Sequence, residues 1–524
     1  MEVSDEMIDQ LRKQVGKLFV VGFDGLTVNE QVKSLIHEYH VGGIILFARN
    51  LANPEQIRQL TSDLQAEAQA AGYEQPLLIA IDQENGSVKR IPRQYMEYPG
   101  AMAIGATEQP SRAFDVAKAT GEDLLTLGIN WNLAPVLDVN NNPDNPVINV
   151  RSFGEDPTKV AAFATAAIQG YQASGIVHSV KHFPGHGDTS VDSHLALPHV
   201  PHGRERLFEV ELKPFIEAIE HNVDSIMTTH IVFDALETDG QTPATLSSAV
   251  MTDLLREELG YQGVVVSDCL EMRAISTTFG VAVAAVRALQ AGVDMLIVSH
   301  TYEEQIQALE QVYQAAKAGQ ITTERLTTAQ SRIQDLIERR NITFTADYSS
   351  ESFFTEEKQA LARDIYHQSV TDVVEGQSIH TDTAVFVIDV IDHHDTVAED
   401  TQDGESLLFR QAQTIFSQVE TAVVDDQAFD ESTLREQVDQ AEAVIIGVKS
   451  LTDGSAFAEL ISQIAQQVPV YLIGLKQPYV GRQFQHIERW INTYENSAEA
   501  VKTALEAIIG RRELEGVSPV RVEE

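Results

Sequence analysis

Short continuous hydrophobic runs alternate with longer segments of helical periodicity over the first 300 residues. Runs such as VVVSD and DMLIVS are almost wholly apolar, which is typical of parallel strands buried on both faces. Eight runs are expected to be strands: 17–23, 43–47, 77–82, 129–139, 176–182, 225–233, 264–268 and 293–299. Eight strands separated by helix-length segments predict an α/β fold, a (β/α)8 TIM-type barrel.

Helix ends in this region are marked by glycine. Segment 252–259 stops at Gly260, and the alanine-rich segment 281–290 is followed by Gly292. Glycine commonly follows the last turn of a helix because it adopts left-handed backbone angles without strain. Segment 303–338 is predicted to form one or two amphipathic helices that close the barrel.

A second domain is expected, because 524 residues exceed what one hydrophobic core usually serves. The barrel is assigned to residues 1–340. Residues 341–357 lack periodicity and are rich in Ser and Thr, so we interpret them as a linker. Residues 358–524 have apolar runs at 384–390, 443–448 and 468–475, which predict a smaller C-terminal α/β sandwich domain with a doubly wound sheet.

Charge and composition exclude several classes of partner. The 37 Lys and Arg residues against 78 Asp and Glu residues give a net charge of −41, which repels phosphate backbones and anionic lipids. We therefore expect no nucleic acid and no membrane partner. The acidic N-terminus lacks the basic start and apolar core of a secretory signal, and Cys269 has no second cysteine to pair with. The expected location is cytoplasmic; the oligomeric state is not predicted.

Polar side chains gather where the predicted strands end. Asp82, Lys181, His182, His230 and Asp268 each follow an apolar run. In a barrel the carboxyl ends of the strands face the active site. These residues are therefore expected to converge on one rim.

Residues 181–194, KHFPGHGDTSVDSH, hold three histidines, two aspartates and a lysine, and their Pro and Gly residues predict a loop. Asp192 and His194 are spaced so that the carboxylate can orient the imidazole for acid/base catalysis. A metal site made of His182, His186, Asp188 or His194 is a second interpretation, although the spacing matches no established metal motif. Purely structural hydrogen bonding is the third.

Asp268 favours the catalytic interpretation. It follows an apolar strand directly, at the predicted rim, where a carboxylate can serve as the nucleophile of a retaining glycosidase. His194 would then supply the proton donor, with no metal required. The neighbouring Cys269 is a weaker candidate nucleophile, since an isolated buried cysteine is usually a small hydrophobic residue.

Five motifs together resemble glycoside hydrolase family 3: KHFPGHGDTSVDSH, IDQENGSVKRI, NPVINVRSFGEDP, PATLS and VVSDCLEM. They are most similar to its β-N-acetylglucosaminidase branch, the NagZ-type enzymes of cell-wall (peptidoglycan) recycling, in a two-domain form. The resemblance covers about residues 8–340. It implies a metal-independent, cofactor-free mechanism through a covalent glycosyl-enzyme, with Asp268 as nucleophile, His194 as acid/base and Asp192 as its partner.

The same resemblance implies five sugar-binding residues, namely Asp82, Arg90, Arg151, Lys181 and His182. Two positions depart from the family pattern, because members commonly read DQEGGRV where this chain has Asn85 and Ser87. Asparagine can adopt the left-handed conformation that glycine would take there. The departures concern substrate detail and not the reaction type.

The expected activity is removal of terminal N-acetylglucosamine (GlcNAc) from a small carbohydrate, either a muropeptide or a chito-oligosaccharide. A phosphorylase using the same residues is an alternative, because a histidine is neutral after donating its proton and so tolerates an incoming phosphate. A family 3 β-glucosidase, a metal-dependent hydrolase and a sugar-binding protein without catalysis are further alternatives.

Overall fold

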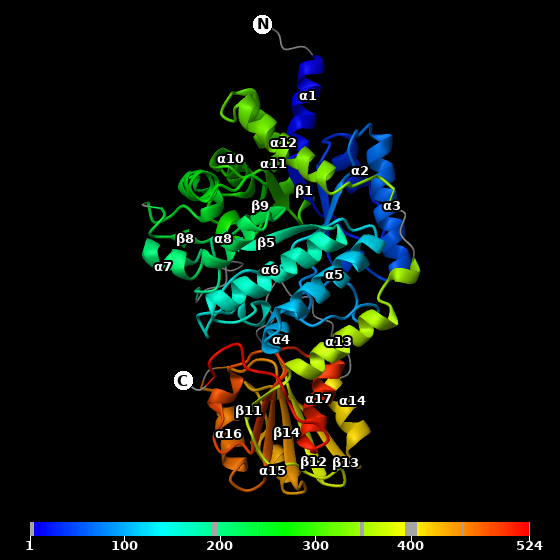
Figure 1. The fold of residues 1–524 in the computed structure, drawn as a ribbon, viewed down its shortest axis with the longest axis vertical. Helices are drawn as coiled ribbons and strands as arrows, with labels where there is room; N and C mark the ends of the chain where they lie inside the picture. Colours follow the sequence, from blue (N-terminus) through cyan, green and yellow to red (C-terminus); the bar gives the residue numbers. More distant parts are fainter. Residues whose placement is uncertain are drawn as a thin grey trace.

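The computed structural model describes residues 5–189, 197–237, 239–345, 350–392, 406–452 and 454–522. Eight parallel strands close into a barrel in the upper part of Figure 1, with β10 returning to pair with β1. The strands are β1 (Phe19–Val21), β2 (Gly43–Leu46), β3 (Leu78–Ile81), β4 (Trp131–Asn132), β5 (Val177–Phe183), β7 (Ser225–Thr228), β9 (Val264–Cys269) and β10 (Met295–Val298). Each predicted apolar run overlaps one of them, so the predicted barrel is confirmed.

Helices surround this barrel. They are α1 (Asp5–Gly16), α2 (Glu30–His37), α3 (Pro54–Ala70), α4 (Ala101–Ala106), α5 (Pro110–Thr126), α6 (Pro157–Ser174), α7 (Arg204–Glu209), α8 (Lys213–Glu220), α9 (Arg273–Ser276), α10 (Val281–Ala291), α11 (Tyr302–Lys317) and α12 (Thr323–Arg339). Predicted helix 281–290 is confirmed, and 303–338 forms two helices. Segment 252–259 overlaps a π-helix, Ala249–Glu258, and Leu259 follows the last residue of that helix. A short ribbon pairs β6 (His199–Val200) with β8 (Val232–Phe233).

Local sequence explains where several of these helices begin. The side chain of Asn53 accepts a hydrogen bond from the Gln56 amide, and Pro54 occupies the first turn of α3. Asp156 caps α6 in the same way, again before a proline. Such caps satisfy amide groups that have no partner within the helix.

The second domain contains a six-stranded sheet in the order β11-β16-β15-β14-β12-β13, in which only β11 is antiparallel to its neighbour. Its strands are β11 (Thr371–Val374), β12 (Ala384–Val390), β13 (Gln418–Val424), β14 (Ala443–Val448), β15 (Val470–Gly474) and β16 (Arg489–Asn492). Its helices are α13 (Glu356–Ser369), α14 (Leu407–Ile415), α15 (Glu431–Val438), α16 (Ala456–Ile464) and α17 (Ala498–Ile508). The three predicted strands are present as β12, β14 and β15, which confirms the second α/β domain.

Both hydrophobic clusters of the described residues draw on both domains. The larger cluster runs from the barrel into α13, α14 and α17. The smaller one lies in the second domain and includes Met102, Ala103 and Ala106 of α4 together with Val150. In Figure 1 α4 lies where the barrel meets the second domain. The predicted domain limits at 340 and 358 stay a prediction. Within the described part of the chain, no helix has the length and apolar character needed to cross a membrane.

Candidate active site

A cavity of about 550 Å³ opens at the carboxyl ends of the barrel strands. Its walls come from residues in or after the last part of β2, β5, β9 and β10 and from the loops after β3 and β4, which is where a barrel places its active site. Six of the predicted site residues line it: Asp82, Arg90, Arg151, Lys181, His182 and Asp268. Asp192 and His194 lie outside the described residues, so their predicted roles stay predictions.

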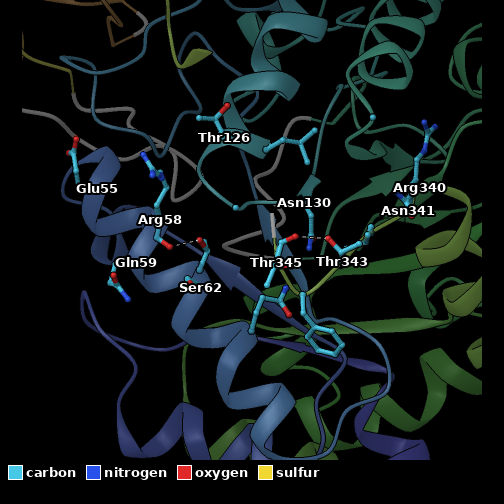
Figure 2. Close-up of a pocket in the computed structure, with 17 residues that line it drawn as sticks. Glu55, Arg58, Gln59, Ser62, Thr126, Asn130, Arg340, Asn341, Thr343 and Thr345 are labelled. Atoms are coloured by element: carbon cyan, nitrogen blue, oxygen red, sulfur yellow. Dashed lines mark hydrogen bonds between the residues drawn. The ribbon is translucent and has the colours of Figure 1, made fainter. Parts of the chain in front are cut away.

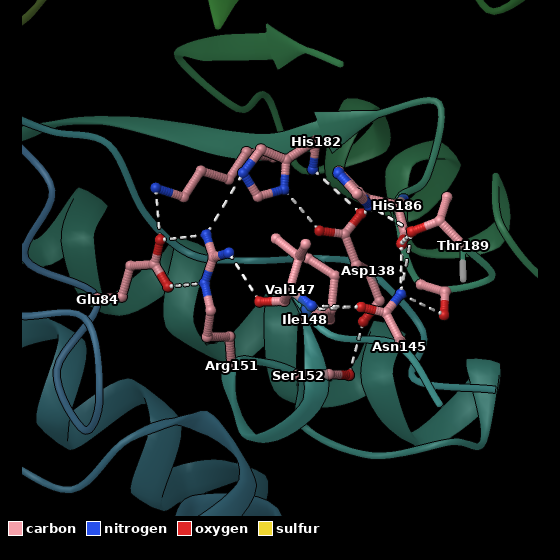
Figure 3. Close-up of polar contacts among 12 residues, drawn as sticks. Glu84, Asp138, Asn145, Val147, Ile148, Arg151, Ser152, His182, His186 and Thr189 are labelled. Carbon is pink, nitrogen blue, oxygen red and sulfur yellow. Dashed lines mark hydrogen bonds and ion pairs between the residues drawn. The ribbon is translucent and has the colours of Figure 1, made fainter. Parts of the chain in front are cut away.

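A chain of alternating charges, in the order Asp82, Lys181, Glu84 and Arg151, forms one wall of the cavity. The Lys181 ammonium lies 2.7 Å from Asp82 and 2.6 Å from Glu84. Glu84 also accepts two hydrogen bonds from the Arg151 guanidinium, at 2.9 and 2.8 Å (Figure 3). Such paired bonds fix the planes of both groups relative to each other. These side chains of β5 and of the loops after β3 and β4 are therefore held in one arrangement.

Burial works against each charge in this chain, and the neighbouring charges outweigh it. Burial raises the pKa of Glu84, but Arg151 and Lys181 lower it further, so the net pKa is well below its usual range. Burial lowers the pKa of Lys181, while Asp82 and Glu84 raise it, and the net shift is upward. Glu84 and Lys181 are therefore both charged near neutral pH.

His182 is oriented by a fully buried carboxylate. Asp138 accepts bonds from the His182 amide at 3.2 Å, the His186 amide at 2.7 Å and the His182 Nδ1 at 2.7 Å. Burial raises the pKa of Asp138 and His182 lowers it, with a net downward shift. Because a carboxylate only accepts, His182 carries a proton on Nδ1. Its Nε2 lies 3.5 Å from an Arg151 nitrogen, at the cavity wall.

Arg90 completes the wall beside Asp82. Its side chain is 4% exposed, lies 3.9 Å from Asp82 and stands over the ring of Phe47 at 5.6 Å. The Arg90 backbone amide donates to the side chain of Gln83, so two distant positions of the loop after β3 are held together. Asn85 in this loop has a φ of 71°, the left-handed conformation expected for it.

Asp268 stands at the end of β9 and accepts a hydrogen bond from the Cys269 amide at 2.7 Å. The Cys269 carbonyl accepts from Nε2 of His230 at 3.0 Å, so the backbone on both sides of that peptide is anchored. Burial, assisted by Glu271, raises the pKa of the Cys269 thiol to about 12. The thiol is therefore neutral at physiological pH and a poor nucleophile.

The sequence profile described as "Glycosyl hydrolase family 3 N terminal domain" matches residues 5–336, more than half of the chain. The chain belongs to glycosyl hydrolase family 3. The resemblance found in its motifs is thereby confirmed.

Curated relatives and solved structures add detail to the family 3 assignment. The chain is 43% identical to "Beta-hexosaminidase A" of Pseudoalteromonas piscicida over 330 residues, which are 59% of this chain and 55% of that protein, so the match spans about half of that relative. It is 37% identical to a "Beta-hexosaminidase" of Photobacterium profundum over 55% of this chain and 83% of the relative. A family 3 β-N-acetylglucosaminidase from Paenibacillus sp. strain FPU-7 superposes with a TM-score of 0.91 at 38% identity, covering 98% and 99% of the two chains.

The metal interpretation gains no support from the described part of this family 3 chain. No group of three His, Cys, Asp or Glu residues among the described residues could hold a metal ion. The candidate ligands have other partners: His182 contacts Asp138, His186 lies 3.0 Å from the Thr189 hydroxyl, and Asp188 pairs with His202. Burial, followed by the charge of His182, lowers the pKa of His186 to about 4, so this imidazole is neutral.

Sequence reasoning missed Glu84 and Asp138, which hold the predicted sugar-binding residues in place. Each carried a signal, because Glu84 lies two residues after Asp82 and Asp138 interrupts the apolar run at 129–139. A carboxylate inside a buried run requires a cationic or hydrogen-bonding partner. The partner itself, however, comes from another strand and cannot be read from local sequence.

A second cavity of about 450 Å³ lies at the opposite end of the family 3 barrel, among α3, the end of α5 and the segment after α12 (Figure 2). Its residues Asn130 and Gly175 precede β4 and β5. None of the predicted site residues that the structure describes lies there. Groups at this end of a barrel usually serve stability.

Proposed function

We propose that this protein is an exo-acting retaining β-N-acetylglucosaminidase that releases terminal GlcNAc from muropeptides or chito-oligosaccharides. The observation that carries the proposal is the position of Asp268, at the end of β9, in the same cavity as the charge chain of Lys181, Glu84 and Arg151. Similarity along almost the whole length of the Paenibacillus β-N-acetylglucosaminidase supports the amino-sugar specificity.

Asp268 is proposed to attack the anomeric carbon and form the glycosyl-enzyme. The bond from the Cys269 amide and the anchored peptide hold its carboxylate at a fixed place on the rim. A fixed carboxylate reacts without reorganisation, which is how a protein makes a weak nucleophile effective. His194, with Asp192 as its partner, is proposed to protonate the leaving oxygen and then to activate water.

The charge chain is proposed to bind the hydroxyl groups of the terminal sugar. A hydroxyl both donates and accepts, so it pairs well with a wall that offers carboxylates and cations next to each other. Asp82 and Lys181 provide such a pair 2.7 Å apart. Arg90, Arg151 and His182 extend it along the wall of the cavity.

The test compares hydrolysis of p-nitrophenyl β-GlcNAc with that of p-nitrophenyl β-glucoside. The wild type should prefer the GlcNAc substrate, and Asp268→Asn should lose roughly 10³-fold or more in kcat. Cys269→Ser is the matched control, because it alters the neighbouring side chain, whose thiol is neutral, and should keep kcat within about threefold. Preference for the glucoside, or full activity of Asp268→Asn, would refute the proposal.

Two additions to the same assay separate the alternatives. Inorganic phosphate as acceptor would yield GlcNAc-1-phosphate, whereas water yields free GlcNAc, so the product identifies the acceptor. Activity should survive EDTA, since the proposed mechanism uses no metal. Loss of activity in EDTA that zinc restores would favour the metal-dependent alternative.

A further inference from the structure

The second domain contacts the two barrel loops that carry most of the charge chain. The loop after β3, residues 82–100, carries Asp82, Glu84 and Arg90, and the loop after β4 carries Asp138 and Arg151. On the basis of the function proposed above, we propose that the second domain positions these loops for sugar binding, with Glu495 and Tyr479 as the positioning residues.

Glu495 holds the end of the first loop. It follows β16, is only 5% exposed, and accepts a hydrogen bond from the Gly100 amide at 2.7 Å. Gly100 lies directly against Gly86, so closely that a Cβ on Gly86 would be 2.7 Å from the Gly100 Cα and 3.2 Å from the Glu495 carboxylate. The Gly86 amide also donates to the carbonyl of Tyr98. The two ends of the segment that carries Arg90 are thus closed on each other beside a carboxylate of the second domain.

Tyr479 contacts the second loop. Its hydroxyl accepts a hydrogen bond at 3.0 Å from the side-chain amide of Asn140, two residues after Asp138. The backbone amide of Asn140 donates to the carbonyl of Gly154, which closes this loop. At its far end the Glu155 amide donates to the carbonyl of Pro519 at 3.2 Å. Both ends of the segment that carries Arg151 therefore meet the second domain.

Apolar packing strengthens both contacts. Met102, Ala103 and Ala106 of α4, directly after Gly100, belong to the hydrophobic cluster of the second domain. Val150, the neighbour of Arg151 in sequence, belongs to it as well. The cluster is completed from the second domain by residues that include Val480, Trp490, Tyr494 and Val520. A displacement of this domain would therefore move both loops.

The charge chain depends on the relative position of the loops. Glu84 from the first loop and Arg151 from the second are joined by two bonds of 2.8 and 2.9 Å. Hydrogen bonds of this kind weaken steeply when the distance or angle departs from its optimum, and a misplacement of about 1 Å can cost a hundredfold in rate. The second domain, which contacts both loops, fixes the distance between them, and none of its described residues lines the cavity.

The test uses the full chain with Glu495→Ala, Glu495→Gln and Tyr479→Phe. Glu495→Ala and Tyr479→Phe should raise KM for the β-GlcNAc substrate and lower kcat/KM by about tenfold. Glu495→Gln should restore most of this loss, because its amide oxygen can still accept from the Gly100 amide. Tyr471→Phe is the matched control: it removes a hydroxyl that donates to Gln377 within the second domain, and kcat/KM should stay unchanged.

Hydrogen exchange tests the positioning without any substrate. In Glu495→Ala the amides of Arg90 and Ile91, which donate to the side chain of Gln83 and not to Glu495, should exchange at least about tenfold faster than in the wild type. In Tyr479→Phe the Arg151 amide should likewise exchange faster than in the wild type. This variant provides the test if Glu495→Ala does not fold. Unchanged exchange, or an unchanged kcat/KM in a folded variant, overturns the proposal. A wild type inactive on β-GlcNAc refutes the proposed function instead, and the exchange result still decides whether the second domain holds the loops.

Discussion

Replacing Asp138 by asparagine tests how the buried carboxylate controls His182. The asparagine oxygen must face the amides of His182 and His186, because an N–H group cannot accept a hydrogen bond. Its NH₂ group then faces His182 Nδ1, which in the wild type lies 2.7 Å from the carboxylate. The imidazole must move its proton to Nε2, where it meets the guanidinium of Arg151 at 3.5 Å. Two donors then face each other at the cavity wall.

The expected magnitude follows from these contacts. The two amide bonds persist but lose the charge of their acceptor, which costs about 1 kcal/mol each in stability. The altered ring presents a donor in place of an acceptor, and a mismatched buried hydrogen bond to a sugar hydroxyl costs about 1–3 kcal/mol. At about 1.4 kcal/mol per tenfold, kcat/KM on p-nitrophenyl β-GlcNAc should fall by roughly 5- to 150-fold.

A matched control exists on the same strand. His178, four residues before His182 in β5, lies 2.9 Å from the buried Asp224 at the other end of the barrel. Asp224→Asn should lower the melting temperature but leave kcat/KM of the folded enzyme within about twofold. The reasoning is refuted if Asp138→Asn keeps kcat/KM within about twofold, or if Asp224→Asn loses as much.

Three other substitutions or reagents address groups around the cavity. The pKa of Glu84 in the folded protein lies below its unfolded value of about 4.5, so the ionised carboxylate stabilises the fold above that pH and this contribution is lost as the pH falls. Glu84→Gln should therefore lower the melting temperature near pH 7, and the melting temperature of the variant should fall less steeply below about pH 4.5 than that of the wild type. Iodoacetamide near pH 7 should leave activity intact, since the Cys269 pKa is about 12; rapid inactivation would contradict this. Gly86→Ala, whose Cβ would overlap Gly100, should cost about 1–3 kcal/mol more in thermal or urea unfolding than Gly25→Ala, which has open space; equal costs would contradict the close contact.

The barrel was predictable because its strands have one feature in common. They are buried, so most of them read as a continuous apolar run bounded by polar residues, although β5 contains His178 and Ser179. In the second domain the same signal found β12, β14 and β15, which lie inside the sheet. It missed the edge strands β13 and β11, most of whose residues are exposed or half-buried. It also missed β16, which is buried between two partners but is only four residues long.

The candidate site divides in a similar way. Asp82, Lys181 and Asp268 could be placed on one rim from their positions after apolar runs. Glu84 and Asp138 could not be assigned, because their roles depend on partners from another loop or strand, brought near only by folding. The role of Glu495 was harder still to predict from sequence, because 395 residues separate it from the glycine that it contacts.

The charge chain described above has a consequence for anyone who wishes to alter substrate preference by directed evolution. Each member neutralises its neighbours, so replacing Lys181 alone leaves Asp82 and Glu84 as adjacent anions, and replacing Glu84 alone leaves Lys181 and Arg151 as adjacent cations. Removing one partner of a buried pair typically costs about 3–5 kcal/mol of folding stability. Most single substitutions at this wall would therefore be recovered only as unfolded protein. Productive variants at this wall should arise from coordinated changes that keep its charge balanced, and libraries that vary two neighbouring positions together are the ones that can reach them.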